Sequence, residues 1–330
     1  MSDIMNYTVG WICAIPMEYD VAQTFLDEVY KGPHNISLYD SNQYVLGRIR
    51  KHYIVVAAML DKEYDIPSTA SVVTNMLRSF PNIRVGLLVG VGGGAPSPKH
   101  DIRLGDIVVS APRGGNGGVF QYDFGKTMQD QRFQSTGFLN QSPPVLRMAV
   151  NALEAQYELY GHQLEEVINS ILDKKPRLRK KYSRPDPSSD RLYQSTFAHP
   201  NNEADCAEVC GDGPLKLIVR QKRTEDGDNP TVHYGLIASG NQVIKDASIR
   251  DALIRERDVL CFEMEAAGLM NHFPCLVVRG ICDYSDSHKN KEWQGYAAMA
   301  AAAYTKDLLY CITASRVKEE KRISDIVSAD

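Results

Sequence analysis

The sequence lacks any apolar run that approaches the roughly 20 residues needed to cross a membrane as a helix. It also lacks an excess of basic charge, since 37 Lys and Arg stand against 41 Asp and Glu and give a net charge of −4. Such a balance provides no overall positive field for nucleic acid. The first 20 residues carry no basic stretch ahead of their apolar segment, as a signal peptide would. We therefore expect a cytoplasmic protein whose partner is a small molecule, with no nucleic acid and no membrane.

Paired metal-ligand motifs are also missing. The seven cysteines are an odd number, and several lie inside apolar runs such as VLCFEME and PCLVVRGIC, where Cys behaves as a small hydrophobe. We expect these cysteines to be reduced. Cys206 and Cys210 stand four residues apart with His199 nearby, but this spacing contains no second ligand pair. The sequence therefore predicts no metal and no cofactor.

What the sequence does contain is an alternation of apolar segments with helical patterns. The segment 85–89 is nearly all apolar, which is typical of a strand buried on both faces. The alternation predicts an α/β fold, a single domain with a central mixed, mostly parallel twisted sheet flanked by helices. The predicted strands are 7–14, 53–60, 85–89, 107–110, 234–238, 259–262 and 275–281, and the predicted helices are 19–29, 67–80, 145–160, 265–272 and 296–312.

Two charged segments interrupt this pattern. Residues 161–232 are dense in charge, Pro and Gly, and we interpret them as an insertion or lid, partly mobile, within a domain of residues 1–315. Residues 316–330 resemble a charged tail or a linker. The insertion contains a basic cluster that could hold phosphates, although a solvated loop is the simpler interpretation. This cluster consists of Lys174, Lys175, Arg177, Arg179, Lys180, Lys181 and Arg184.

Chemistry-bearing residues follow four of the predicted strands, and ligands of α/β sheets bind beyond the carboxyl ends of strands. Glu18 follows the first strand, and the sequence GVGGG, which we interpret as a glycine-rich turn, follows the third. The last two strands are followed by Glu263 and Glu265, and by Asp283 and Asp286. Each residue alone could have an ordinary role in capping a helix or a turn. Together they place several carboxylates and a glycine loop at one crevice.

A set of carboxylates without a His or Cys ligand cluster suits the cleavage of an N-glycosidic bond. Its transition state carries a cationic ribose, which a carboxylate stabilises, and the leaving purine needs a proton at N7 from a carboxyl group with a raised pKa. A second carboxylate can activate water on the opposite face of the sugar, as in inverting glycosidases. Neighbouring ribose hydroxyls can also donate hydrogen bonds to a carboxylate.

Several segments resemble the nucleoside phosphorylase/nucleosidase superfamily. FEMEAAGLM followed by VVRGICD is similar to its signature region, and VGVGGGAPSPKHDIRLGDIVVS is similar to its glycine loop and the next strand. VGWICAIPMEYDV resembles the opening strand of the methylthioadenosine nucleosidase branch, and IASGNQVIKD resembles the segment that contacts the base. The forms GNQVIKD and CDYSDSHKN resemble fungal members, which are often fused to signalling modules. The resemblance implies a nucleoside phosphorylase-like fold and a homo-oligomer, specifically a dimer.

The same resemblance implies roles for individual residues. Asp283 would donate a proton to purine N7, Glu18 would activate water, and Glu265 would bind the ribose hydroxyls. Met264 would pack beneath the sugar, and Glu263 would lie near the sugar and the water. The predicted catalytic residues are therefore Asp283, Glu18 and Glu265.

A further set of substrate-binding residues is implied for the glycine loop and the base-contacting segment. Val243 stands where relatives often stack an aromatic ring, and Cys282 stands where they usually have Ser. The remaining members of the set are Val91, Gly92, Gly93, Asn241, Gln242 and Ile244.

The choice between water and phosphate depends on arginines. Phosphorylases of the superfamily hold phosphate with Arg and Ser side chains, and the resemblance places Leu88 and Val91 at two of those positions. A phosphate dianion without charge-assisted donors would bind poorly in a desolvated pocket. We therefore expect a purine nucleosidase that needs neither phosphate nor metal and releases free base and ribose from adenosine- or guanosine-type ribonucleosides. Three alternatives stay open: an AMP or ATP nucleosidase that uses Arg220, Lys222 and Arg223, a phosphorylase, and a non-catalytic nucleotide sensor.

Overall fold

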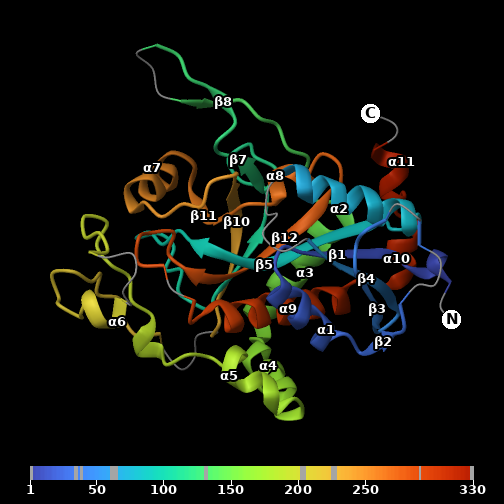
Figure 1. Ribbon diagram of the computed structural model, residues 1–330, viewed down its shortest axis with the longest axis horizontal. Helices are drawn as coiled ribbons and strands as arrows, with labels where there is room; N and C mark the ends of the chain where they lie inside the picture. Colours follow the sequence, from blue (N-terminus) through green and yellow to red (C-terminus); the bar gives the residue numbers. More distant parts are fainter. Residues whose placement is uncertain are drawn as a thin grey trace.

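The structure is a computed structural model, and it describes residues 3–32, 36–37, 40–59, 66–129, 133–200, 206–223, 229–289 and 291–327. A twisted sheet lies between two layers of helices (Figure 1). Helices α1, α3, α4 and α9 pack together on one face, and α2 and α8 pack on the other. This arrangement confirms the predicted α/β architecture. Among the described residues, no helix has the length and apolar character needed to span a membrane.

The helices and strands have the following bounds. The helices are α1 (Pro16–Phe25), α2 (Ile66–Ser79), α3 (Pro144–Tyr160), α4 (Leu164–Lys174), α5 (Arg179–Tyr182), α6 (Cys206–Val209), α7 (Ala247–Arg257), α8 (Ala266–Leu269), α9 (Gln294–Cys311), α10 (Ala314–Glu319) and α11 (Ile323–Val327). The strands are β1 (Val9–Cys13), β2 (Glu28–Tyr30), β3 (Tyr44–Ile49), β4 (His52–Ala58), β5 (Val85–Gly94), β6 (Ile107–Ser110), β7 (Val119–Gln121), β8 (Gly125–Lys126), β9 (Gln134–Ser135), β10 (Val232–Ser239), β11 (Val259–Glu263) and β12 (Cys275–Asp283).

The main sheet has the strand order β11-β10-β6-β12-β5-β1-β4-β3-β2, and β7 pairs with β10. Strands β4, β1, β5 and β12 run parallel, whereas β6 is antiparallel to β12 and the β4–β3–β2 edge is antiparallel. Strand β11 also pairs antiparallel with β5, so β5, β12, β6, β10 and β11 form a closed ring. Phe262 on β11 and Asp283 on β12 both stand opposite Gly93 of β5. The closure therefore brings together strand ends that lie far apart in the sequence.

The centre of the sheet is apolar because helices cover both of its faces. Every residue of β12 is buried, and so is nearly all of β5. Helix α9 packs on β12 through an alanine-rich surface. At Gly280 a Cβ atom would overlap with the backbone carbonyl of Ala297 in α9, so glycine is required for this close approach.

Three local predictions differ from the structure. The sequence GVGGG does not form a turn, because β5 continues through it to Gly94. The first helix begins at Pro16, since Pro is well suited to the first turn of a helix, and it ends at Phe25. Residues 28 and 29, predicted as the end of this helix, belong to β2 instead, which pairs with β3, a strand that was not predicted.

The described part of the predicted insertion contains a packed helix. Helix α4 buries Leu164, Ile168 and Leu172, and it contacts α9. The spacing of four residues between these side chains produces an apolar stripe along one side of the helix. Residues 164–174 are therefore packed on the body of the protein, while the status of the segment as an insertion and the role of its basic cluster stay predictions.

The predicted C-terminal tail or linker also forms helices that pack on the domain. Val317 in α10 and Ile323 in α11 are fully buried. The N–H of Ile323 donates to the carbonyl of Ile83 at 2.9 Å. The described residues as far as 327 thus contact the body of the protein instead of extending from it. The domain boundary at residue 315 stays a prediction.

Candidate active site

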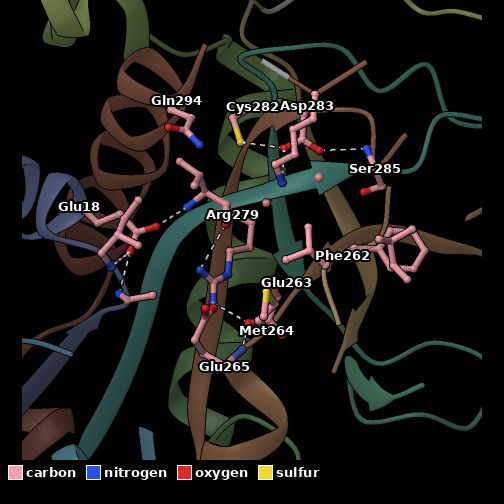
Figure 2. A pocket seen from close by; sticks show the side chains of 18 of the residues that line it. Glu18, Phe262, Glu263, Met264, Glu265, Arg279, Cys282, Asp283, Ser285 and Gln294 are labelled. Carbon is pink, nitrogen blue, oxygen red and sulfur yellow. Dashed lines mark hydrogen bonds and ion pairs between the residues drawn. The ribbon is translucent and has the colours of Figure 1, made fainter. Parts of the chain in front are cut away.

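A pocket of about 180 Å³ lies at the carboxyl ends of β1, β5, β11 and β12 (Figure 2). It brings together all of the predicted site residues except Asn241. The predicted residues that line it are Glu18, Val91, Gly92, Gly93, Gln242, Val243, Ile244, Glu263, Met264, Glu265 and Asp283. Their individual roles in substrate binding and catalysis stay predictions.

Two residues selected from the sequence lie outside this pocket. Asn241 is exposed, and its backbone N–H donates to Asp123 at 2.7 Å. This hydrogen bond to Asp123 holds the turn after β10. Gln242, Val243 and Ile244, which follow Asn241 in the sequence, line the pocket instead. Asp286 is buried within the loop after β12, and its Oδ1 accepts the N–H of His288 at 2.9 Å.

Glu18 lies in the first turn of α1 and reaches back toward the end of β1. Its Oε2 accepts backbone hydrogen bonds from Ala14 at 2.7 Å and Ile15 at 3.2 Å, and its Oε1 accepts one from Val91 at 2.8 Å (Figure 2). These three N–H groups hold the carboxylate where β1 and β5 meet. Glu18 thus has two roles. As an acidic residue in the first turn, it stabilises the start of helix α1, and its side chain also lines the pocket.

Arg279 of β12 binds two of the glutamates. Its Nη2 donates to Glu263 Oε2 at 2.5 Å and to Glu265 Oε2 at 2.8 Å. Glu263 also accepts the backbone N–H groups of Glu265 at 3.2 Å and Ala266 at 3.0 Å, and so it caps the start of α8. Glu263 is therefore held in place from two sides, and the shared guanidinium fixes Glu265 beside it.

The charges in this part of the pocket do not balance. Three buried carboxylates line this part of the pocket beside one guanidinium, that of Arg279, which pairs with Glu263 and Glu265 but not with Glu18. Burial raises the pKa of Glu18, and Arg279 offsets only part of the rise. Burial also raises the pKa of Glu265, to about 8, against the opposing effect of Arg279. A pocket with this excess of acidic groups favours a bound proton or a cationic ligand.

Asp283, the last residue of β12, is held by a backbone donor and a side-chain donor. Its Oδ1 accepts the N–H of Ser285 at 2.9 Å, and its Oδ2 lies 2.8 Å from Lys289 Nζ. Ser285 has a φ of 52°, in the left-handed region that residues other than glycine seldom adopt. The loop after β12 thus curls back on Asp283 and fixes its carboxylate at the pocket.

The glycines of β5 make room for these carboxylates. At Gly90 a Cβ atom would overlap with the carboxylate of Glu18. At Gly93 it would overlap with the Ser285 hydroxyl and come within 2.8 Å of Asp283 Oδ1. Neither glycine adopts a positive φ. Gly90 and Gly93 of the motif GVGGG are therefore explained by the space that pocket side chains need, and not by the conformational needs of a turn.

Some pocket residues were missed in the sequence analysis. Arg279 could have been predicted from the sequence, because a charged residue inside the apolar strand CLVVRGIC indicates a buried ion pair. Lys289 and Gln294 also line the pocket, but nothing in the sequence distinguishes them from ordinary polar residues of a loop and a helix start.

An aromatic ring lines the pocket although Val243 is not aromatic. Phe262, at the end of β11, contributes this ring, and Tyr122 packs against it edge-on at a centroid distance of 6.0 Å. The sequence signal was the alternation of side chains along a strand, which places Phe262 and Met264 on the same face. Phe262 therefore gives the pocket the aromatic surface that position 243 lacks.

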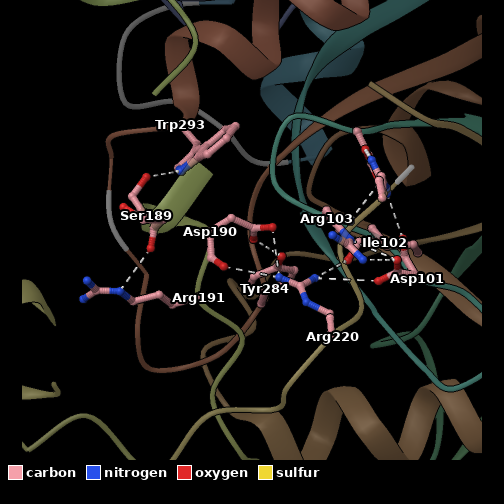
Figure 3. Close-up of polar contacts among 12 residues, drawn as sticks. Asp101, Ile102, Arg103, Ser189, Asp190, Arg191, Arg220, Tyr284 and Trp293 are labelled. Carbon is pink, nitrogen blue, oxygen red and sulfur yellow. Dashed lines mark hydrogen bonds and ion pairs between the residues drawn. The ribbon is translucent and has the colours of Figure 1, made fainter. Parts of the chain in front are cut away.

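The described basic residues of the predicted insertion do not line this pocket. Arg220 forms an ion pair with Asp190 at 2.9 Å, beside Tyr284 (Figure 3). Arg223 forms two bonds to the buried carboxylate of Asp106, at 2.6 Å and 2.5 Å. Both arginines are thus occupied by carboxylates, and they join the segment to the body of the protein.

The chain has the nucleoside phosphorylase-like fold of solved nucleosidase structures. The 5′-methylthioadenosine/S-adenosylhomocysteine nucleosidase of Helicobacter pylori superimposes with a TM-score of 0.57 at 14% identity, covering 93% of this chain and 99% of that chain. The futalosine hydrolase of Helicobacter pylori gives a TM-score of 0.55 at 16% identity, covering 94% and 100%. These similarities confirm the fold that the sequence resemblance implied. No family model matches the chain.

Relatives were also found by sequence. A nucleotide-binding leucine-rich repeat (NLR)-like protein of Hyaloscypha variabilis is 43% identical over 316 residues, which are 96% of this chain and 30% of that protein. The ATP nucleosidase Cap17 of Escherichia coli is 38% identical over 101 residues, 29% of this chain and 20% of that protein. The 5′-methylthioadenosine/S-adenosylhomocysteine nucleosidase of Mycobacterium bovis is 23% identical over 312 residues, 92% and 96% of the two chains. This chain thus spans less than a third of the length of the first two relatives.

Proposed function

We propose that the chain hydrolyses the N-glycosidic bond of purine ribonucleosides and releases free base and ribose. The observation that carries the proposal is the charge arrangement of the pocket. Three buried carboxylates lie beside one guanidinium, which pairs with two of them, and a separate carboxylate, Asp283, is held at the pocket by Ser285 and Lys289. Relatives that are named as nucleosidases support the same class of reaction.

In the proposed reaction, the bond between C1′ and N9 breaks and its electron pair leaves with the purine. Asp283, in its protonated form, donates a proton to N7. Glu18 accepts a proton from water while the water oxygen bonds to C1′. Glu265 accepts hydrogen bonds from the ribose hydroxyls, and the excess of acidic groups stabilises the positive charge that develops on the sugar. Phe262 provides an apolar surface for the base.

Water suits this pocket better than phosphate. The guanidinium of Arg279, which a phosphate would need, is already shared by Glu263 and Glu265. Leu88 is fully buried, and Val91 offers a backbone N–H that Glu18 already accepts. A phosphate dianion would therefore meet several carboxylates without an available cationic partner.

Purine release is expected to proceed in phosphate-free buffer and to yield ribose. Adding phosphate should leave the rate unchanged, because the nucleophile is water. The measurement is chromatographic detection of the base together with identification of the sugar product, for adenosine, guanosine, inosine, methylthioadenosine and ATP in parallel. Ribose 1-phosphate as the main product would overturn the hydrolase, and binding without base release would indicate a sensor.

Glu265→Gln is expected to lower kcat/KM by roughly 10²-fold, because the neutral amide no longer stabilises the developing positive charge. The preference for ribonucleosides over 2′-deoxyribonucleosides should fall as well, since the amide can donate where the carboxylate only accepted. The measurement is kcat/KM for both sugars. Glu166→Gln, which alters an exposed residue of α4, is the matched control. An unchanged ratio between the two sugars contradicts the role given to Glu265.

A nucleotide nucleosidase is the second candidate, and the similarity to ATP nucleosidase Cap17 favours it. That relative is 38% identical where it aligns, against 23% for the methylthioadenosine enzyme. Against this candidate, Arg220 and Arg223 are occupied by Asp190 and Asp106. Values of kcat/KM for adenosine and ATP at low and high salt separate the two candidates, because salt weakens a contribution from phosphate contacts.

The homodimer and the cytoplasmic location stay proposals. Exposed aromatic side chains on the arm formed by β8, β9 and their flanks support the dimer. Phe124, Phe133 and Phe138 are all exposed there, and Figure 1 shows the arm extending away from the body of the protein. Exposed apolar clusters of this kind often mark protein interfaces. Light scattering of the purified chain measures the oligomeric state directly.

A further inference from the structure

Three metal-binding side chains meet where the predicted insertion contacts the loop after β12, and a fourth faces two of them. The ligand atoms of His199, Cys206 and Cys210 all lie within 4.8 Å of one another. Cys206 begins α6 and Cys210 directly follows it, and side chains four residues apart lie on the same side of a helix. Both cysteines are buried.

His288, from the loop after β12, faces the two sulfurs of this group. Its Nδ1 lies 3.6 Å from Cys206 Sγ and 3.4 Å from Cys210 Sγ. In a tetrahedral site with Zn–S of about 2.3 Å and Zn–N of about 2.0 Å, a sulfur and a nitrogen ligand are roughly 3.5 Å apart. The observed separations therefore match two edges of such a tetrahedron.

The other ring nitrogen of His288 has the partner that metal-binding histidines usually have. Its Nε2 lies 2.8 Å from the carbonyl oxygen of Phe197, which can only accept, so Nε2 carries the hydrogen. The lone pair of the neutral ring is then on Nδ1, the atom that faces both sulfurs. The ring also stacks on Tyr193 at a centroid distance of 3.9 Å, which fixes its plane.

We propose that His199, Cys206, Cys210 and His288 bind one Zn²⁺ ion. Two thiolates balance the charge of the ion, and two neutral imidazoles complete its coordination, so a neutral centre forms in a buried place. Binding releases the two thiol protons to solvent. A tetrahedral set of two sulfurs and two nitrogens is typical of zinc.

The zinc site is structural, because four protein ligands leave no open position for a substrate. It joins the segment around His199 to the loop that carries Lys289, the partner of Asp283. The N–H of His199 donates to Ser287 Oγ at 2.9 Å, which makes the same connection. A cavity of about 210 Å³ lies between the cluster and the candidate active site, with Cys206 and Asp283 both in its wall. No step of the proposed hydrolytic reaction passes through this ion.

Elemental analysis of the full chain, purified without chelator, tests the proposal. We expect about one zinc per chain, as four ligands of one site require. Replacing zinc by Co²⁺ should produce the thiolate-to-cobalt charge-transfer band and the visible bands of a tetrahedral site. In Cys206→Ser/Cys210→Ser, zinc should fall to roughly a tenth or less, and the cobalt bands should vanish. Cys311→Ser, which alters an exposed cysteine, is the matched control and should retain both the bound zinc and the cobalt bands.

His199→Asn keeps the experiment decisive if the double variant does not fold. His199 is the least buried of the four residues, so this variant is expected to fold. Its zinc affinity, measured by competition with a chromophoric chelator, should be at least roughly tenfold weaker. The proposal is wrong if neither Zn²⁺ nor Co²⁺ binds to the wild-type chain, or if the variants bind as the control does. None of these measurements depends on nucleosidase activity.

Discussion

Asp283→Asn is expected to lower kcat by about 10²–10⁴, the range for removal of a general acid. The amide matches the carboxyl group in shape and can still accept the N–H of Ser285, which the structure places 2.9 Å from Asp283 Oδ1. It has no acidic proton to deliver to purine N7. Steady-state kinetics with the best substrate of the nucleoside panel measure the loss.

The same variant separates catalysis from a structural role. Asn caps turns as well as Asp does, so a residue that only shapes the loop would leave the rate near that of the wild type. A nucleoside that is methylated at N7 needs no proton there, and its hydrolysis should be slowed far less by Asp283→Asn. Equal loss for both substrates contradicts proton donation. Asp173→Asn, on the exposed surface of α4, is the matched control.

Glu18→Ala is expected to lower kcat by about 10²–10⁴, because the general base for water is removed. Formate, a small carboxylate, should restore part of the rate by entering the space that the side chain leaves. Glu158→Ala, an exposed residue of α3, is the matched control and should keep the wild-type rate with or without formate. A rate near that of the wild type in folded Glu18→Ala would return Glu18 to its role in the first turn of α1.

The pH dependence gives a second measurement for Glu18. A general base works only when it is deprotonated, and burial raises the pKa of Glu18. The rate of the wild type should therefore fall as the pH drops through a value above the ordinary glutamate pKa of about 4.3. Glu18→Ala should lose this dependence. Because the folded state holds this proton more tightly than the unfolded state, the free energy of unfolding decreases as the pH rises through the same range.

The main layers of the fold could be predicted from the sequence, but the closure of the sheet could not. Alternating apolar and helical segments indicate the strands, because burial on both faces requires continuous apolar runs. The pairing of Phe262 with Gly93 leaves no such pattern, since β11 is one short apolar run whether or not it bonds to β5. The glycines beside it were therefore interpreted as a turn, when they provide space for Glu18 and Ser285.

The acidic residues of the pocket could be predicted because they follow strands directly. The burial of these residues and their ion-pair partners could not be predicted. Burial of Glu265 against Arg279 depends on the registers of β11 and β12 against β5, which the sequence does not specify. The same limit applies to the metal ligands. Cys206 and Cys210 show the local spacing of a ligand pair, but His288 comes from a distant loop, and only the folded chain brings it to the sulfurs.

The closed ring of strands also sets an order of events during synthesis. Strands β1 and β5 are both synthesised early and can pair, whereas β12, which pairs with the other edge of β5, is made much later. Pairing between such distant segments is slow, and an unpaired apolar edge invites association with other nascent chains. The pocket cannot exist before Asp283 and Lys289 have left the ribosome tunnel. A partly synthesised chain therefore lacks the complete pocket of the proposed nucleosidase.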